Sequence, residues 1–209
     1  MKVQTAEPTA TPTTIQSACT VPANLRRLVL TGFMGAGKTT VGRLLADRLG
    51  WEFLDLDAYI EARTGLSVPS IFSAHGEPRF RQLESSALAS ALGHSNLVLA
   101  LGGGTPEVLT NRLLLEQTPA TSTIFLDAPF PALYDRCMME ALNPGTPALP
   151  DLTAQTRPLL ADPAAAEARF LARQPVYRRL ARLTLSTVGL TPDETVSTLL
   201  ASLTAASRF

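Results

Sequence analysis

The sequence contains a glycine-rich segment whose residue types and spacing suit phosphate binding. Residues 32–39 read Gly-Phe-Met-Gly-Ala-Gly-Lys-Thr, which fits the pattern G-x-x-x-x-G-K-[ST]. The glycines let the backbone come close to phosphate oxygens, and a following helix directs its free N–H groups to the same place. Lys38 would reach the β- and γ-phosphates, and the hydroxyl of Thr39 would ligate Mg²⁺. The segment predicts a nucleotide-binding site, and a plain strand-to-helix turn is the alternative.

Two carboxylates stand close together after the next apolar run. Strand alternation places Asp55 and Asp57 on one side of an extended segment. Ligands of open α/β sheets bind at this carboxyl end of the strands. We expect Asp55 to support Mg²⁺ through water, and Asp57 to face an acceptor hydroxyl and accept its proton late in phosphoryl transfer. There are two alternatives: the pair caps the next helix, or Asp127, which ends another apolar run, takes the metal role.

Further residues could hold the acceptor molecule. Arg81 and Glu84 are three residues apart on a predicted helix and share a face. The Gly102–Gly104 run suggests a backbone surface that a ligand approaches closely. Arg173 could grip a carboxylate with its planar guanidinium, whereas Arg157, after a proline-rich loop, could fold onto the transferring phosphate. A surface ion pair, a flexible turn and ordinary surface charges are the corresponding alternatives.

An α/β fold must position these residues. From Arg26 onward, short apolar runs alternate with helical patterns, which is typical of a mostly parallel sheet. The expected strands are residues 28–31, 52–56, 97–101, 123–127 and 183–187. The expected helix starts are Ser67 with Pro69, Pro106, Pro131, and Pro192 with Asp193 and Glu194. Residues 141–156 are rich in proline and predict a mobile loop between two ordered elements.

Length and composition limit the classes of protein that fit. A chain of 209 residues favours one domain with a full hydrophobic core. Lys plus Arg and Asp plus Glu number 18 each, so no net field attracts nucleic acid, and no apolar run is long enough for a membrane span. The two cysteines and two histidines lack metal-ligand spacing, which favours a reducing cytoplasm. Residues 1–24 are rich in Thr, Ala and Pro and predict a disordered tail, with a targeting peptide as the alternative.

Six segments of the chain occur in the order and approximate spacing of shikimate kinase. They are Gly-Phe-Met-Gly-Ala-Gly-Lys-Thr, Phe-Leu-Asp-Leu-Asp, Gly-Glu-Pro-Arg-Phe-Arg-Gln-Leu-Glu, Gly102–Gly104, Arg-Pro-Leu-Leu from Arg157, and Arg-Gln-Pro-Val-Tyr from Arg173. The chain thus resembles P-loop kinases of the nucleoside-monophosphate-kinase type over about residues 26–204. The resemblance implies a three-layer α/β fold with a central five-stranded parallel sheet, helices on both faces and a mobile lid at about residues 141–160. It also implies one domain, residues 25–209.

The resemblance implies a reaction and residue roles as well. The family transfers the γ-phosphate of ATP to the 3-hydroxyl of shikimate, with Mg²⁺, on the route to chorismate and the aromatic amino acids. Carried over by motif, the ATP-binding residues would be Gly35, Ala36, Gly37, Lys38, Thr39, Thr40, Arg136 and Arg157. The shikimate-binding residues would be Asp57, Arg81, Gly102, Gly103, Gly104 and Arg173. The catalytic residues would be Lys38, Asp57 and Arg157, with Glu84 orienting Arg81, and Thr39 and Asp55 serving the metal.

Two departures and three rival functions accompany the resemblance. The segment 137–156 is longer than we expect for the lid. The adenine loop at residues 188–192 lacks the basic residue often found there, so a contact at Leu190 would be made through the backbone; by the resemblance, the side chain of Arg136 packs on adenine. Gluconate and a nucleoside monophosphate are alternative acceptors within the same fold. A nucleotide-binding regulator without turnover is a rival of a different class. We expect a cytoplasmic monomer that acts on small molecules.

Overall fold

The computed structural model describes residues 21–142 and 162–206. Most of the expected N-terminal tail and most of the expected lid, including Arg157, lie outside the described residues. Among the helices within these two ranges, none is both long enough and apolar enough to cross a bilayer.

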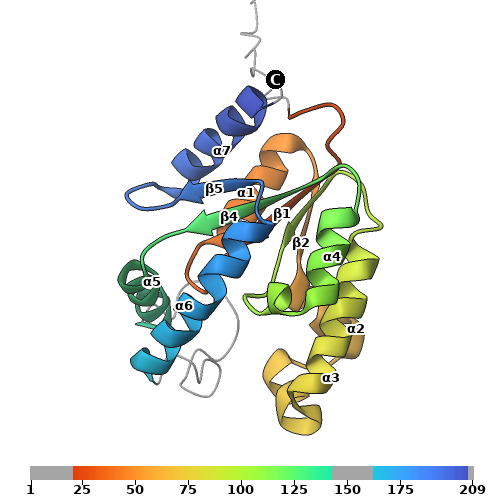
Figure 1. The fold of residues 1–209 in the computed structure, drawn as a ribbon, viewed down its shortest axis with the longest axis vertical. Coiled ribbons are helices and arrows are strands. Elements are labelled where there is room, and N and C mark those ends of the chain that lie inside the picture. Colours follow the sequence, from red (N-terminus) through yellow and green to blue (C-terminus); the bar gives the residue numbers. More distant parts are fainter. Residues whose placement is uncertain (1–20, 143–161, 207–209) are drawn as a thin grey trace, which may run out of the picture.

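Five parallel strands form the central sheet in the order β2-β3-β1-β4-β5 (Figure 1). Their bounds are Arg27–Thr31 for β1, Glu52–Asp55 for β2, Leu97–Ala100 for β3, Thr121–Asp127 for β4 and Leu183–Ser186 for β5. All five expected strands are confirmed, each to within two residues at either end. Because every strand runs the same way, the loops that follow them meet at one edge of the sheet.

Helices cover both faces of the sheet and complete three layers (Figure 1). They are α1 Lys38–Leu49, α2 Leu56–Thr64, α3 Val68–Ala91, α4 Leu109–Gln117, α5 Phe130–Leu142, α6 Pro163–Leu180 and α7 Pro192–Ala206. Side chains of β1 alternate between the faces: Leu28 and Leu30 pack in the cluster with α1 and α7, whereas Val29 packs in the cluster with α3 and α4. The three-layer α/β architecture expected from the sequence is confirmed.

Three of the four expected helix starts are confirmed. Ser67 caps α3 by accepting a hydrogen bond from the Ser70 N–H, Pro131 is the second residue of α5, and α7 begins at Pro192. Pro106 is the exception, because it lies in a 3₁₀ turn, η1 (Thr105–Glu107), and α4 begins only at Leu109. Tertiary contacts explain the correction: the Thr105 hydroxyl is bonded to Glu84 and its carbonyl to Asn111, which fixes a tight turn before the helix.

The helix that follows the phosphate-binding loop lies close against the sheet because it has glycine at the contact. A Cβ placed on Gly42 of α1 would overlap the ring of Phe53 on β2 and lie 3.3 Å from a Leu30 methyl. The approach of α1 to β2 brings the start of the helix near the end of the strand.

We therefore expect Gly42→Ala to destabilise the protein by about 1–2 kcal/mol, although alanine is the better helix former. Thermal unfolding of the variant beside the parent protein measures the effect. A higher melting temperature in the variant, as helix propensity alone would give, would contradict this packing.

Candidate active site

The phosphate-binding segment joins β1 to α1 and has the conformation that its glycines permit. Gly35 and Gly37 adopt φ of 74° and 85°, in the left-handed region that other residues rarely enter. A Cβ on Gly35 would also overlap the carbonyl of Leu133, so the loop packs directly on α5. The ammonium of Lys38 donates to the carbonyls of Gly32 at 2.9 Å and Phe33 at 3.0 Å. A cation and a helix N-terminus are thus held in one loop, as phosphate binding requires.

Two oxygen-bearing side chains meet beside this loop. The hydroxyl of Thr39, at the start of α1, donates to Oδ2 of Asp55, at the end of β2, over 2.8 Å. The other oxygen of Asp55 accepts the N–H groups of Asp57 and Ala58. Asp127, the alternative from the sequence, instead accepts from Arg178 at 3.1 Å. Hydroxyl and carboxylate oxygens are the ligands that Mg²⁺ prefers, so the Thr39–Asp55 pair has suitable chemistry for that ion.

Asp57 lies near Asp55 for a different reason from the one the sequence predicted. The extended segment ends at Asp55, which caps α2, and Asp57 sits in the first turn of that helix. The prediction that the strand continues past residue 55 to Asp57 is therefore wrong. The alternative, that Asp55 caps the next helix, is confirmed. The acidic first turn suits the positive end of the helix dipole, and the capping bonds to Asp55 favour the helix over a longer strand.

The surroundings of Asp57 change its acidity. Loss of hydration, then the negative charges of Asp55 and Glu84, raise the pKa of this carboxyl to about 7, against an opposing effect of Lys38. Its Oδ1 lies 2.9 Å from where a Cβ on Gly102 would be. A group with a pKa near the working pH can both hold and release a proton.

Arg81 is held by acidic side chains of its own helix. Its Nη1 donates to Oε2 of Glu84 at 2.8 Å, and its Nε and Nη2 donate to Oε1 of Glu77 at 3.2 and 3.0 Å. Glu84 is only 1% exposed, and its other oxygen accepts from the Thr105 hydroxyl at 2.6 Å. The expected contact of Arg81 with Glu84 is therefore present, and burial of Glu84 fixes the guanidinium in place.

The triple-glycine turn is where these groups come together. A Cβ on Gly104 would lie 2.5 Å from Nη2 of Arg81, and one on Gly102 would lie 3.1 Å from Oε1 of Glu84. A Cβ on Gly103 would be 3.6 Å from Nη1 of Arg173. A side chain at position 102 or 104 would therefore collide with the charged groups. Glycine is needed at these positions because the charged side chains lie close to the backbone.

Two residues of α6 approach the same turn. Arg173 is 9% exposed and donates from Nη2 to Oε2 of Glu107 at 2.6 Å, while Tyr177, one helical turn later, donates from its hydroxyl to the carbonyl of Gly103 at 2.5 Å. Burial raises the pKa of the Tyr177 hydroxyl, so it stays a donor. The Nε of Arg173 is buried and has no hydrogen-bond partner within the part of the chain that the structure describes.

Arg136 lies on the other side of the phosphate-binding loop. It donates from Nη1 and Nη2 to the side chain and carbonyl of Thr187 at 2.9 and 2.8 Å, and from Nη1 to the carbonyl of Gly35 at 3.5 Å. It thus bridges the loop to the end of β5. The histidines are peripheral: His94 pairs with Glu52 at 3.0 Å, at the amino end of β2.

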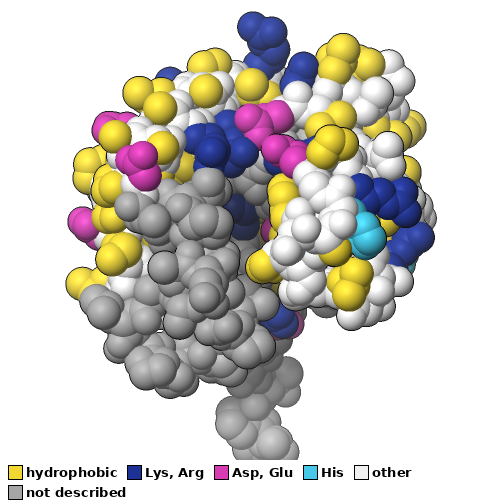
Figure 2. All heavy atoms as spheres, turned by 90° about the horizontal axis from the view of Figure 1, so that it is seen from below, with side chains coloured by type: hydrophobic (Ala, Val, Ile, Leu, Met, Phe, Trp, Pro, Cys, Tyr) yellow, Lys and Arg dark blue, Asp and Glu magenta, His cyan; other side chains and the backbone are white. Residues whose placement is uncertain are grey.

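The edge of the sheet at which the strands end is hollowed and charged (Figure 2). Figure 2 looks from below onto the sheet edge where the strands end, and it shows Lys and Arg side chains along a hollow with acidic side chains at its rim. Three contributors were not predicted: Thr105, Glu107 and Tyr177. Tyr177 could have been found as the residue four after Arg173 on one helical face, and Thr105 as the residue after the glycines, whereas nothing in the sequence singles out Glu107.

A family model, curated relatives and solved structures all indicate the same family for this chain. A family model described as shikimate kinase matches residues 34–204. A shikimate kinase of Geobacter metallireducens is 36% identical over 183 residues, or 87% of this chain and 93% of that protein. One of Symbiobacterium thermophilum is 40% identical over 163 residues, or 77% of this chain and 86% of that protein. The solved structure of an Acinetobacter baumannii shikimate kinase in complex with shikimate has a TM-score of 0.73 and 32% identity, covering 87% of this chain and 94% of that one.

The raised pKa of Asp57 links the site to stability. Folding favours the protonated carboxyl, so this contribution is complete below the ordinary pKa of 3.8 and is lost as pH rises through about 7. Asparagine carries no charge at any pH. We expect the melting temperature of Asp57→Asn to exceed that of the parent protein by a margin that grows between pH 5 and pH 8.

Calorimetry at several pH values measures that margin, with the exposed Asp47→Asn as the charge-matched control. A margin that stays constant or shrinks as pH rises would show that the carboxyl of Asp57 ionises as easily in the folded as in the unfolded chain.

Proposed function

The chain belongs to the shikimate kinase family, and we propose that its site transfers the γ-phosphate of ATP to the 3-hydroxyl of shikimate, giving ADP and shikimate 3-phosphate. The observation that carries this proposal is the meeting of Asp57, Arg81 and Arg173 at the Gly102–Gly104 turn. Two guanidinium groups can together bind one carboxylate of an acceptor, and the carboxyl group beside them can accept a hydrogen bond from a hydroxyl of the same molecule. Shikimate carries both functions on one ring, and its phosphorylation belongs to the route to chorismate and the aromatic amino acids.

The acceptor is bound by charge and activated by proton transfer. Arg81 and Arg173 bind the shikimate carboxylate, and Gly102, Gly103 and Gly104 let the ring approach the backbone. Asp57 accepts the proton of the 3-hydroxyl while the oxygen of that hydroxyl bonds to the γ-phosphorus of ATP. In the same step, the bond between the γ-phosphorus and the departing oxygen of ADP breaks. A pKa near 7 makes Asp57 a better base than an ordinary aspartate while leaving a usable ionised fraction.

The donor is held by the phosphate-binding loop. Gly35, Ala36, Gly37, Thr39 and Thr40 contact the phosphates, and Lys38, now bonded to two loop carbonyls, turns its ammonium to the β- and γ-phosphates. Arg136 contacts adenine from between the loop and β5, which its bonds to Gly35 and Thr187 support. The resemblance adds Arg157 as a further contact of the transferring phosphate. Glu84 orients Arg81 from the buried side.

A magnesium ion would be held by Thr39 directly and by Asp55 through water. The support for this is the 2.8 Å contact between their oxygens, which come from two separate elements and have the hard character that Mg²⁺ selects. When bound, the ion would neutralise charge that develops between the β- and γ-phosphates.

The setting of the enzyme is proposed on composition and resemblance. We propose a cytoplasmic monomer that acts on small molecules, with residues 25–209 as one domain, residues 1–24 as a tail and a lid at about residues 141–160. The equal numbers of acidic and basic residues, 18 each, support small-molecule partners over nucleic acid.

An acceptor panel tests the assignment. ADP release is followed with shikimate, gluconate and nucleoside monophosphates at fixed ATP and Mg²⁺. We expect turnover with shikimate to exceed that with the others by several orders of magnitude, because gluconate lacks a rigid ring, and a nucleoside monophosphate has a phosphate in place of the carboxylate and adds a base. Robust turnover of gluconate without turnover of shikimate would refute the proposal.

Two variants separate binding from chemistry. Asp57→Asn should lower kcat by roughly 10² or more with ATP affinity nearly unchanged, because the proton acceptor is lost. Arg173→Ala should instead raise the KM for shikimate by roughly 30-fold or more, since a buried charged contact is removed. The exposed Arg179→Ala on the same helix is the control and should change neither value. Near-normal kcat in Asp57→Asn would remove that residue from the mechanism.

A further inference from the structure

We propose that Glu107 is an internal stand-in for the substrate carboxylate: it binds Arg173, and shikimate must displace it. This inference rests on the proposed function, in which Arg173 binds the carboxylate of the acid. It makes Glu107 a residue that sets substrate affinity through Arg173 without taking part in the chemistry.

The contact between the two side chains resembles the one that the substrate would make. Oε2 of Glu107 accepts from Nη2 of Arg173 at 2.6 Å, a distance typical of a charge-assisted hydrogen bond. A guanidinium can bind a carboxylate through two nitrogens in either of two ways, with Nε and Nη2 or with Nη1 and Nη2. Nη2 takes part in both ways. Glu107 therefore engages the nitrogen that either mode of shikimate binding requires. It leaves the buried Nε of Arg173 unpaired within the described residues.

The two partners differ in their freedom to move. The side chain of Arg173 is 10% exposed and lies against the Gly103 turn, whereas that of Glu107 is 42% exposed. The side chain of Glu107 can therefore rotate into the solvent at little cost in free energy, while that of Arg173 keeps its position. Glu84 provides the contrast on Arg81: it is 1% exposed and also accepts from Thr105, so it is a fixed partner.

When shikimate binds, its carboxylate and that of Glu107 compete for Arg173, and electrostatics favours the departure of Glu107. Glu107 and the substrate carboxylate repel each other when both face one guanidinium, and the exposed one regains hydration on leaving. Arg173 is thus competent to bind only in the fraction of molecules in which Glu107 has turned away, which raises the apparent Kd by the reciprocal of that fraction. The pair also stabilises the fold, because Glu107 compensates the charge of the nearly buried Arg173.

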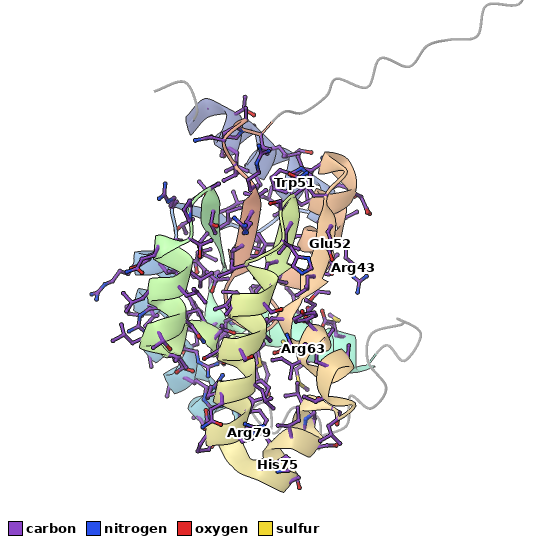
Figure 3. The ribbon with its side chains drawn as sticks, turned by 90° about the vertical axis from the view of Figure 1, so that its right-hand side faces the viewer. Arg43, Trp51, Glu52, Arg63, His75 and Arg79 are labelled. Carbon is purple, nitrogen blue, oxygen red and sulfur yellow. The ribbon has the colours of Figure 1, made fainter. Side chains whose placement is uncertain are left out.

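Glu107→Gln tests the proposal because glutamine keeps the size and loses the charge. At saturating ATP, we expect the KM for shikimate to fall roughly 3- to 10-fold with kcat within twofold of the parent enzyme. Glu107→Asp, which keeps the charge, should return KM toward the parent value. Glu52→Gln is the matched control: Glu52 is also an exposed glutamate whose carboxylate contacts a nitrogen-bearing side chain, that of His94, at the start of β2, where Figure 3 labels it, and the loss of its charge should leave KM unchanged.

A second readout excludes a merely structural effect. Without shikimate, Glu107→Gln should melt at a lower temperature than the parent protein, because Arg173 loses its partner, yet shikimate should raise its melting temperature by more. A higher KM in Glu107→Gln would show that Glu107 orients Arg173 during binding, and an unchanged KM would show that it plays no part; either result overturns the proposal. Failure of the parent enzyme to phosphorylate shikimate would refute the proposed function instead.

Discussion

The close approach of charged side chains to the backbone at Gly102–Gly104 is the constraint on which the site depends. Arg81 lies where a side chain of residue 104 would be, and Asp57 and Glu84 lie where one of residue 102 would be. Asp57 comes from α2, Arg81 and Glu84 come from α3, and Arg173 comes from α6. A bare backbone at the end of β3 is what allows side chains from three different helices to meet at one place.

The meeting of several charges has an electrostatic cost that the fold bears. Asp57 is held near two other carboxylates and partly out of water, which raises its pKa to about 7 and opposes folding at neutral pH. Glu84 is buried, but it accepts from both Arg81 and Thr105, so its charge is compensated. A strongly raised pKa, as at Asp57, is typical of a group that does chemistry, whereas a buried carboxylate with two fixed donors, as at Glu84, is suited to positioning its neighbours. The same reasoning gives the exposed Glu107 a role different from that of Glu84.

Most of the scaffold and the conformation of the phosphate-binding loop could be predicted from the sequence because the signals there are local. Each strand is a short apolar run, and the phosphate-binding segment carries its glycines and its Lys38 within eight residues. Predictions failed where tertiary contacts overrule local pattern. Asp55 caps α2 and ends the strand before Asp57, and contacts of Thr105 hold Pro106 in a 3₁₀ turn. Glu107 could not be found, because only the folded chain brings it to Arg173, 66 residues away.

A crystal structure of the protein with ADP and shikimate tests the central claim most directly. The account predicts the acid at the Gly102–Gly104 turn, with its carboxylate between the guanidinium groups of Arg81 and Arg173. Its 3-hydroxyl should lie within hydrogen-bonding distance of Asp57 and face the β-phosphate of ADP. Shikimate bound elsewhere, or bound at the turn with its carboxylate turned away from both arginines, would contradict the account.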